Sequence, residues 1–224
     1  MPKEIRIPFT QIRIGRFLFL LISILLMFTL RPFLEGFVGI NLLMGIFVSA
    51  VFLSGIYAVS QKKNVFYISL IIAAPALILP WSKYFVTDPS FLLAGKIFGA
   101  VFYTFMVFIM LNYLFSEKEI TADIIIGAIC AYFLIGLMWA SFFTILEIFQ
   151  PGSFKIPEHS GAGLSYFSYY SFVTITTLGY GDITPITAPA RSLSILEAIM
   201  GQLYVTILIA RLVAIHISQS MQRK

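Results

Sequence analysis

One loop segment stands out in the sequence: Thr174-Ile175-Thr176-Thr177-Leu178-Gly179-Tyr180-Gly181-Asp182. It lies within residues 149–191, a segment between two long apolar stretches that is too long for a turn and too rich in polar residues, glycine and proline for a membrane span. Non-helical backbone is tolerated at membrane depth only where protein or a water-filled cavity surrounds it. We therefore predict a re-entrant loop over residues 149–191, with a short pore helix at residues 165–175 leading into the quoted stretch.

The composition of the whole chain is that of a membrane protein. Its 224 residues are 59% hydrophobic and 11% charged, with a mean hydropathy of +0.95, whereas an ordinary soluble domain has about 25% charged residues. A soluble core of this size cannot hide so much apolar surface from water. Because Cys130 is the single cysteine, no disulfide can form within the chain. These values exclude a secreted disulfide scaffold, a disordered chain and a cytosolic enzyme.

We predict an all-α membrane protein with six transmembrane helices. Six apolar stretches are each close to the roughly 20 residues that a membrane-spanning helix needs, although the third is short and we expect Pro75 to break it. The stretches are residues 17–34, 37–59, 65–79, 91–115, 124–148 and 192–217. The quoted segment lies between the fifth and the sixth.

Lysine and arginine residues predict the orientation, because they are enriched in cytoplasmic loops. A cytoplasmic N-terminus and six spans put most of them on the cytoplasmic side. These are Lys3, Arg6, Arg13, Arg16, Lys62, Lys63, Lys118, Arg211, Arg223 and Lys224, against Arg31, Lys83, Lys155 and Arg191 outside. We therefore expect a multi-pass protein of the plasma membrane, in contact with lipid, with both termini in the cytoplasm. The net charge of +5 is spread over loop ends, so no nucleic-acid partner is expected.

The quoted stretch resembles the selectivity loop of the potassium-channel family, which reads T-V-G-Y-G or a close variant. The similarity extends over residues 117–219, which include the short helix before the loop and the two flanking spans. Leu178 occupies the position where valine is commoner. The resemblance implies a pore domain at residues 117–219 and a potassium-selective channel.

The remaining segments are assigned around this pore domain. Residues 1–16 form a basic cytoplasmic N-terminus, residues 17–116 a four-helix membrane domain at the position of a voltage sensor, and residues 220–224 a cytoplasmic tail. The tail is short, so we expect no cytoplasmic ligand-binding domain in this chain.

Elementary chemistry supports the same interpretation. A potassium ion that enters a narrow pore loses its water, and oxygen ligands must replace it. Successive carbonyls can face one axis if the backbone alternates between left- and right-handed conformations, and glycine reaches positive φ most readily. We expect Gly179 and Gly181 to do so, and the ion to be held by the carbonyls of Thr177, Leu178, Gly179 and Tyr180 and by the Thr177 hydroxyl. One chain supplies one such loop and four surround an ion, so we predict a homotetramer.

The resemblance also implies residues that support the filter. Tyr169 and Tyr170 stand where the family often has paired tryptophans, and we expect Tyr180 to pack against them. Asp182, at the outer mouth, is placed to accept a hydrogen bond from the Tyr169 hydroxyl and to concentrate cations.

Thr174 and Thr176 complete the predicted support of the filter. Three residues before Thr176, some family members carry a glutamate that is hydrogen-bonded to the aspartate, whereas this chain has Val173. Slow inactivation at the filter therefore does not follow from the resemblance. The C-terminal dipole of the helix at 165–175 favours a cation next to it.

Gly201, in the last span, has two interpretations. It stands at the spacing where the family has a hinge glycine for the gate, and it would equally allow two helices to pack closely. Glu197 lies one turn earlier. Because intramembrane charges are costly and seek polar surroundings, we expect Glu197 behind the filter rather than facing lipid.

The first four spans lack the charge of a voltage sensor. Such a sensor needs several basic residues on one helix, because one charge moved across 100 mV yields only about 2.3 kcal/mol, and the stretch at 91–115 contains Lys96 alone. We expect weak or absent voltage gating. A gating charge of several elementary charges per channel in patch-clamp recordings would contradict this.

Three alternatives to a potassium channel stay open. A channel that also passes sodium is the nearest of them. A pore-loop cation transporter would usually show internal repeats with paired broken helices, and the sequence has one filter-like segment. A membrane enzyme is disfavoured because the sequence contains neither a His-Glu-x-x-His nor a Gly-x-Ser-x-Gly pattern. We expect no cofactor, only potassium as the permeant ion.

Overall fold

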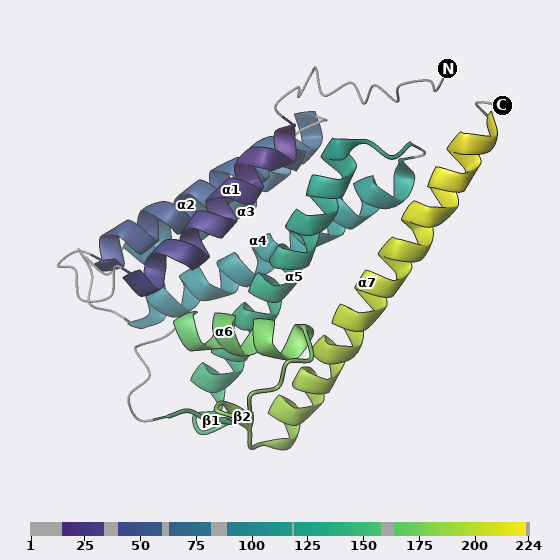
Figure 1. Cartoon of the computed structure of the whole chain (residues 1–224). Coiled ribbons are helices and arrows are strands. Elements are labelled where there is room, and N and C mark those ends of the chain that lie inside the picture. The colour runs from purple at the N-terminus through teal and green to yellow at the C-terminus, as the bar shows by residue number, and fades with distance from the viewer. Residues whose placement is uncertain are drawn as a thin grey trace.

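The computed structural model describes residues 15–33, 40–59, 63–81, 89–117, 119–157 and 164–222. These residues form mainly helices (Figure 1). The elements are α1 (Arg16–Phe33), α2 (Ile40–Val59), α3 (Lys63–Trp81), α4 (Pro89–Ser116), α5 (Ala122–Phe149), β1 (Phe154–Lys155), α6 (Leu164–Ile175), β2 (Thr184–Pro185) and α7 (Ala188–Gln222). The basic N-terminus up to residue 14, the loop lysines Lys62, Lys83 and Lys118, and the last two residues of the tail lie outside the described residues.

Several hydroxyl groups in the helices are hydrogen-bonded within their own helix, which suits an apolar environment. Ser23, Ser141 and Thr144 each donate a hydrogen bond to the carbonyl four residues earlier, at 2.8, 2.9 and 2.7 Å. With such a bond, the hydroxyl group does not need a water molecule as its hydrogen-bond acceptor. At the start of α5, Thr121 caps the helix by accepting a hydrogen bond from the backbone N–H of Ile124 at 3.3 Å.

Several helices are long and apolar enough to cross a membrane. By length and composition four of the described helices qualify, through the windows Leu42–Val59, Leu93–Ser116, Ala122–Phe149 and Ala188–Gln219. Two further apolar windows, Phe17–Leu30 in α1 and Lys63–Leu79 in α3, are shorter. The helices therefore support a membrane protein, and the count of six spans stays a prediction.

The predicted break at Pro75 is wrong. The structure shows α3 as one helix from Lys63 to Trp81, although Pro75 has no N–H to donate to the carbonyl of Ile71. A proline inside a helix is compatible with continuity where neighbouring helices hold the two halves in line, and α3 packs against α4.

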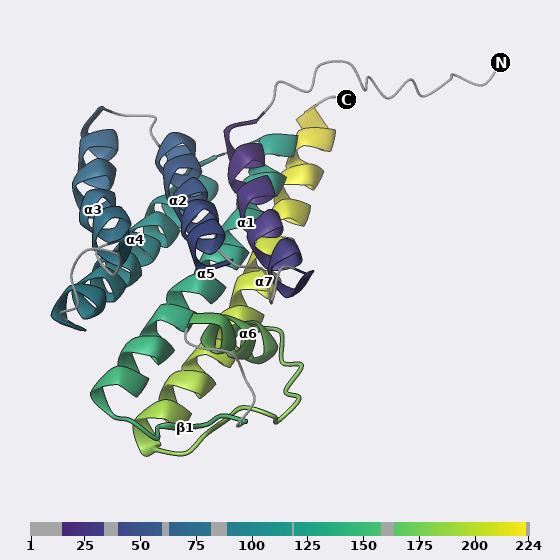
Figure 2. The same cartoon turned by 90° about the vertical axis from the view of Figure 1, so that its left-hand side faces the viewer.

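The helices form two groups that share α5. Helices α1 to α4 lie together on one side, while α6 and α7 lie on the other (Figures 1 and 2). Helices α1 and α4 pack against α5 from the first group, and α6 and α7 from the second. Aromatic contacts fill the first group: Phe52 stacks on Phe102 at 4.2 Å between ring centroids, and Phe17 lies 5.6 Å from Tyr113.

A short antiparallel pair joins the two ends of the segment between α5 and α7. Strand β1 pairs with β2, with Phe154 opposite Pro185 and Lys155 opposite Thr184. The turn before β1 is held by the Glu147 carboxylate, which accepts hydrogen bonds from the N–H groups of Gly152 at 2.8 Å and Phe154 at 3.2 Å. The end of α5 is thereby joined to the chain that follows the filter.

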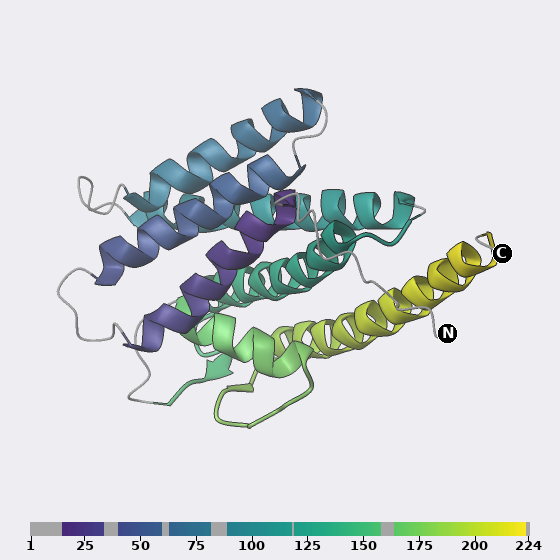
Figure 3. The same ribbon diagram turned by 45° about the horizontal axis from the view of Figure 1, so that its top comes forward.

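Helix α7 lies alongside α5 and α6 (Figure 3). In its N-terminal half, one face consists of Ala190, Ser194, Glu197 and Gly201, which are all buried and recur every three or four residues, the period of one helix face. A Cβ on Gly201 would lie 2.5 Å from the carbonyl oxygen of Ile175. Gly201 therefore allows α7 to touch the C-terminal end of α6, which is the packing interpretation.

This contact predicts opposite effects for two glycine-to-alanine substitutions. Alanine is favoured over glycine in a helix by about 1 kcal/mol, so Gly99→Ala in α4, where a Cβ would meet nothing within 4 Å, will raise or preserve stability. Gly201→Ala forces a methyl group against backbone and will lower stability by about 1–3 kcal/mol. Thermal unfolding of the two variants in detergent measures this, and an equal rise in Tm for both would contradict the packing role.

Candidate ion-conducting site

Residues 174–182, which we call the filter segment, alternate between positive and negative φ around the two glycines, as the sequence predicts. Gly179 has φ +61° and Gly181 has φ +77°, so the expected positive-φ glycines are confirmed. Thr177 also has positive φ, at 59°, and this residue was missed. Thr177 lies two residues before Gly179, so it continues the spacing of the glycines. Sequence alone does not predict its positive φ, because β-branched residues rarely adopt this conformation. Three alternate residues of the segment thus adopt left-handed backbone.

The amides of the filter turn back toward α6. The carbonyl of Val173 accepts hydrogen bonds from the N–H groups of Leu178 at 2.9 Å and Gly179 at 3.2 Å, and the N–H of Thr177 donates to the carbonyl of Thr174 at 2.9 Å. These bonds satisfy carbonyls at the C-terminal end of α6 that have no partner within the helix.

The same bonds fix the direction of the filter carbonyls. In a planar trans peptide the C=O and the next N–H point in opposite directions, and the described residues contain no cis peptide bond. Because the amides of Leu178 and Gly179 both point at Val173, the carbonyls of Thr177 and Leu178 both point away from α6. Two successive carbonyls on one side of the chain is the arrangement that an ordinary strand cannot give.

The filter is open on the side away from α6. All residues from Thr176 to Asp182 are exposed in the single chain, including Leu178 at 55% and Tyr180 at 67%. Thr176 directs its hydroxyl back into α6, to the carbonyl of Phe172, while Thr174 is half-buried on the last turn. The segment is therefore hydrogen-bonded to α6 on one side and exposed on the other.

Asp182 and Tyr169 are hydrogen-bonded at the C-terminal end of the filter segment, as expected from the sequence. The Tyr169 hydroxyl donates to Asp182 Oδ2 at 2.8 Å, and the N–H of Ile183 donates to Oδ1 at 3.0 Å. Desolvation, followed by the hydrogen bond to Asp182 and the charge of its carboxylate, raises the pKa of Tyr169 to about 12. A raised pKa favours the neutral phenol, so Tyr169 keeps the proton with which it binds Asp182.

Tyr170 lies in an aromatic cluster and is bonded to α7. Its ring lies 5.1 Å from that of Phe143 and 5.3 Å from that of Phe154, and its hydroxyl is 2.6 Å from Ser194 Oγ on α7. Tyr170 is 5% exposed, whereas Tyr180 remains 67% exposed. Tyr170 therefore fills an aromatic cluster between α5, α6 and β1 of its own chain, and the packing of Tyr180 against Tyr169 and Tyr170 stays a prediction.

Glu197 is buried against α6 and does not face outward, as predicted. It is fully buried, and its Oε1 is 2.5 Å from Ser171 Oγ on α6. Helix α7 runs unbroken through Gly201, so the structure shows the packing role of that glycine while a gate hinge stays a prediction.

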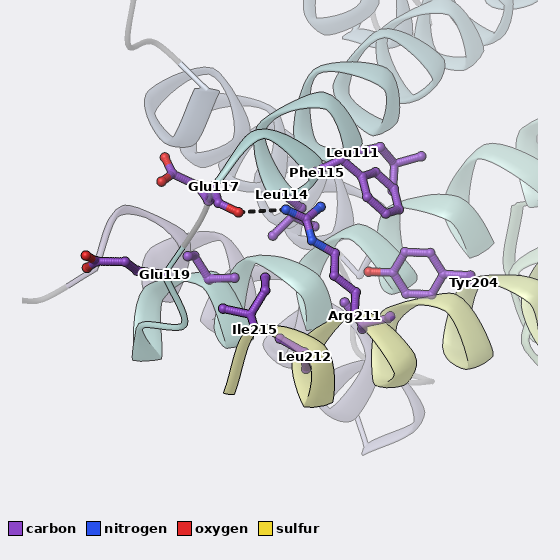
Figure 4. Close-up of a pocket in the computed structure, with 11 residues that line it drawn as sticks. Leu111, Leu114, Phe115, Glu117, Glu119, Tyr204, Arg211, Leu212 and Ile215 are labelled. Atoms are coloured by element: carbon purple, nitrogen blue, oxygen red, sulfur yellow. Dashed lines mark hydrogen bonds between the residues drawn. The ribbon is translucent and has the colours of Figure 1, made fainter. Parts of the chain in front are cut away.

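The C-terminal half of α7 is joined to the end of α4 (Figure 4). Arg211 Nη2 donates to the backbone carbonyl of Glu117 at 2.6 Å, and its guanidinium lies 5.0 Å from the centre of the Phe115 ring. Figure 4 shows the Glu117 carboxylate pointing away from Arg211. The first helix group is thus connected to the inner part of α7 by a hydrogen bond and a cation–π contact.

A comparison with protein families finds a match in this region of the chain. Residues 124–217 match the model of a family described as an ion channel. The match begins in α5, includes α6 and the whole filter segment, and ends in α7. A search of curated proteins found no match. The family match supports an ion-channel family, and the apolar helices agree with a membrane channel.

Proposed function

We propose that this chain forms a potassium-selective channel, as a homotetramer that conducts potassium passively through its Thr-Leu-Gly-Tyr-Gly filter. The observation that carries the proposal is the alternating positive φ at Thr177, Gly179 and Gly181. A run of carbonyls on one side of the chain offers a dehydrated cation a series of oxygen ligands. Leu178 contributes its carbonyl in the same way as valine would.

The homotetramer is proposed because one filter segment covers one side of an ion only. The segment is held from α6 and exposed on its other side, so further copies around a shared axis are needed to complete the coordination. The exposed face of α7, which includes Ile195, Leu203 and Ile209 at 60, 53 and 56% exposure, suits contacts with other copies or with lipid.

We place the channel in the plasma membrane with both termini in the cytoplasm, and with little voltage dependence. Helix α4 carries Lys96 as its basic residue, so moving this helix would transfer little charge. No cofactor is proposed, and potassium is the permeant ion.

Substitution of Gly179 tests the function. Gly179 and Gly99 both have nothing within 4 Å of an added Cβ, but Gly179 alone of the two has positive φ, at +61°. A left-handed conformation costs an L-residue roughly 1–2 kcal/mol, and a tetramer incurs this cost four times. We therefore expect Gly179→Ala to abolish potassium flux into liposomes, while Gly99→Ala keeps it.

The flux assay uses purified protein, and gel filtration shows whether each variant keeps the size of the wild type. Potassium flux in Gly179→Ala equal to that of the wild type would contradict a filter at this position. Sodium flux as fast as potassium flux in the wild type would favour the non-selective cation channel instead.

A pair of substitutions separates the charge of Asp182 from its hydrogen bond. Asp182→Asn keeps an acceptor for Tyr169 but removes the negative charge, so we expect lower single-channel conductance at low ionic strength. The loss will disappear near 1 M salt, where the Debye length is about 3 Å. Tyr169→Phe keeps the charge and will leave the salt dependence unchanged. If both variants show the same salt dependence as the wild type, Asp182 does not lie at the mouth of the pore.

A further inference from the structure

Glu197 is an acidic residue buried where a charge is costly. It lies on α7 within a membrane-spanning window and is 0% exposed. Its Oε1 contacts Ser171 Oγ on α6, while Oε2 is buried and has no hydrogen-bond partner among the described residues. An ionised carboxylate with one unsatisfied oxygen in such a place costs several kcal/mol.

The protons around Ser171 can be counted. Ser171 Oγ is 2.5 Å from Glu197 Oε1 and 2.7 Å from the carbonyl oxygen of Gly136 on α5. Both distances are those of O–H···O hydrogen bonds. The serine hydroxyl has one proton, and the carbonyl of Gly136 can only accept. If Glu197 were ionised, both neighbours of Ser171 would be acceptors, and one of the two short contacts would contain no proton.

A proton on Glu197 resolves this conflict. Glu197 then donates to Ser171 Oγ, and Ser171 donates to the carbonyl of Gly136, so each short contact contains a proton. A protonated carboxylic acid has one O–H donor, which is the number that this chain of bonds needs.

The neighbouring tyrosines do not supply that proton. Among the described residues, Tyr132 and Tyr170 are the titratable groups that neighbour Glu197. However, Tyr132 directs its hydroxyl to the carbonyl of Ile175. Tyr170 contacts Ser194, whose own proton is donated within α7, so the proton of Tyr170 lies in that bond.

These hydrogen bonds lie close to the residue that holds the filter. Ser171 is two residues before Val173, whose carbonyl accepts hydrogen bonds from the amides of Leu178 and Gly179. The chain from Glu197 through Ser171 to Gly136 therefore connects α7, α6 and α5 next to the point where the filter is attached.

We propose that Glu197 is a positioning residue that acts as a neutral carboxylic acid, donating its proton to Ser171 and so holding α6 and the filter in register. The proposal rests on the proposed channel function for its effect on conduction, and on the bond geometry alone for the proton. It predicts that an uncharged donor of the same shape replaces Glu197, whereas a residue without a donor does not.

The test compares Glu197→Gln and Glu197→Ala with Glu147→Gln as a matched control. The side-chain amide that Glu197→Gln introduces can donate to Ser171, so this variant will conduct potassium within about twofold of the wild type. Glu197→Ala will lose about tenfold in flux or in selectivity over sodium. Glu147→Gln is the control because it makes the same substitution at a glutamate that is only an acceptor. Both Glu147 oxygens accept from backbone N–H groups, and the NH₂ group of the introduced amide cannot replace one of these acceptors.

Infrared spectra of the reconstituted protein read the proton directly. The wild type will show the C=O stretch of a protonated carboxylic acid, shifted in D₂O, and this band will be absent from Glu197→Gln and present in Glu147→Gln. A wild-type spectrum identical to that of Glu197→Gln in this region would overturn the proposal.

The two measurements separate the possible failures. A tenfold loss of flux in Glu197→Gln would also overturn the proposal, because an uncharged donor of the same shape would then not replace Glu197. If the wild type conducts no potassium, the proposed function fails, and the infrared band still decides whether Glu197 carries the proton.

Discussion

The double hydrogen bond to the carbonyl of Val173 is the constraint on which the rest of the filter depends. One carbonyl receives two consecutive amides, so the two preceding carbonyls must point the other way. A chain can follow this path only if alternate residues take positive φ, which Gly179 does without steric cost. Thr177 adopts the same conformation despite its β-branched side chain, so surrounding contacts hold it there.

Those contacts come from a scaffold that approaches α6 from two sides. Helix α7 reaches it through Ser194, Glu197 and Gly201, with two hydrogen-bonded contacts followed by a bare backbone contact. The aromatic cluster around Phe143 and β1 holds the other side of α6. Because α6 is fixed in this way, the segment attached to it can keep a strained backbone without relaxing, which a mobile loop cannot do.

Local sequence pattern predicts the parts of this arrangement that depend on local chemistry. Apolar stretches locate the helices, and the glycine spacing predicts positive φ at Gly179 and Gly181. Pattern does not predict an outcome that a distant partner decides. Pro75 stays within a helix because α3 packs on α4. Tyr170 turns into an aromatic cluster because the pairing of β1 with β2 places Phe154 against its ring.

The central claim is that main-chain oxygens of this segment replace the hydration of potassium in preference to sodium. The most direct measurement is the reversal potential of the wild-type channel in a planar bilayer, with potassium on one side and sodium on the other. For a potassium-selective channel, we expect the reversal potential to lie close to the equilibrium potential of potassium, with little current carried by sodium. A reversal potential near zero, or one that follows chloride, would contradict it.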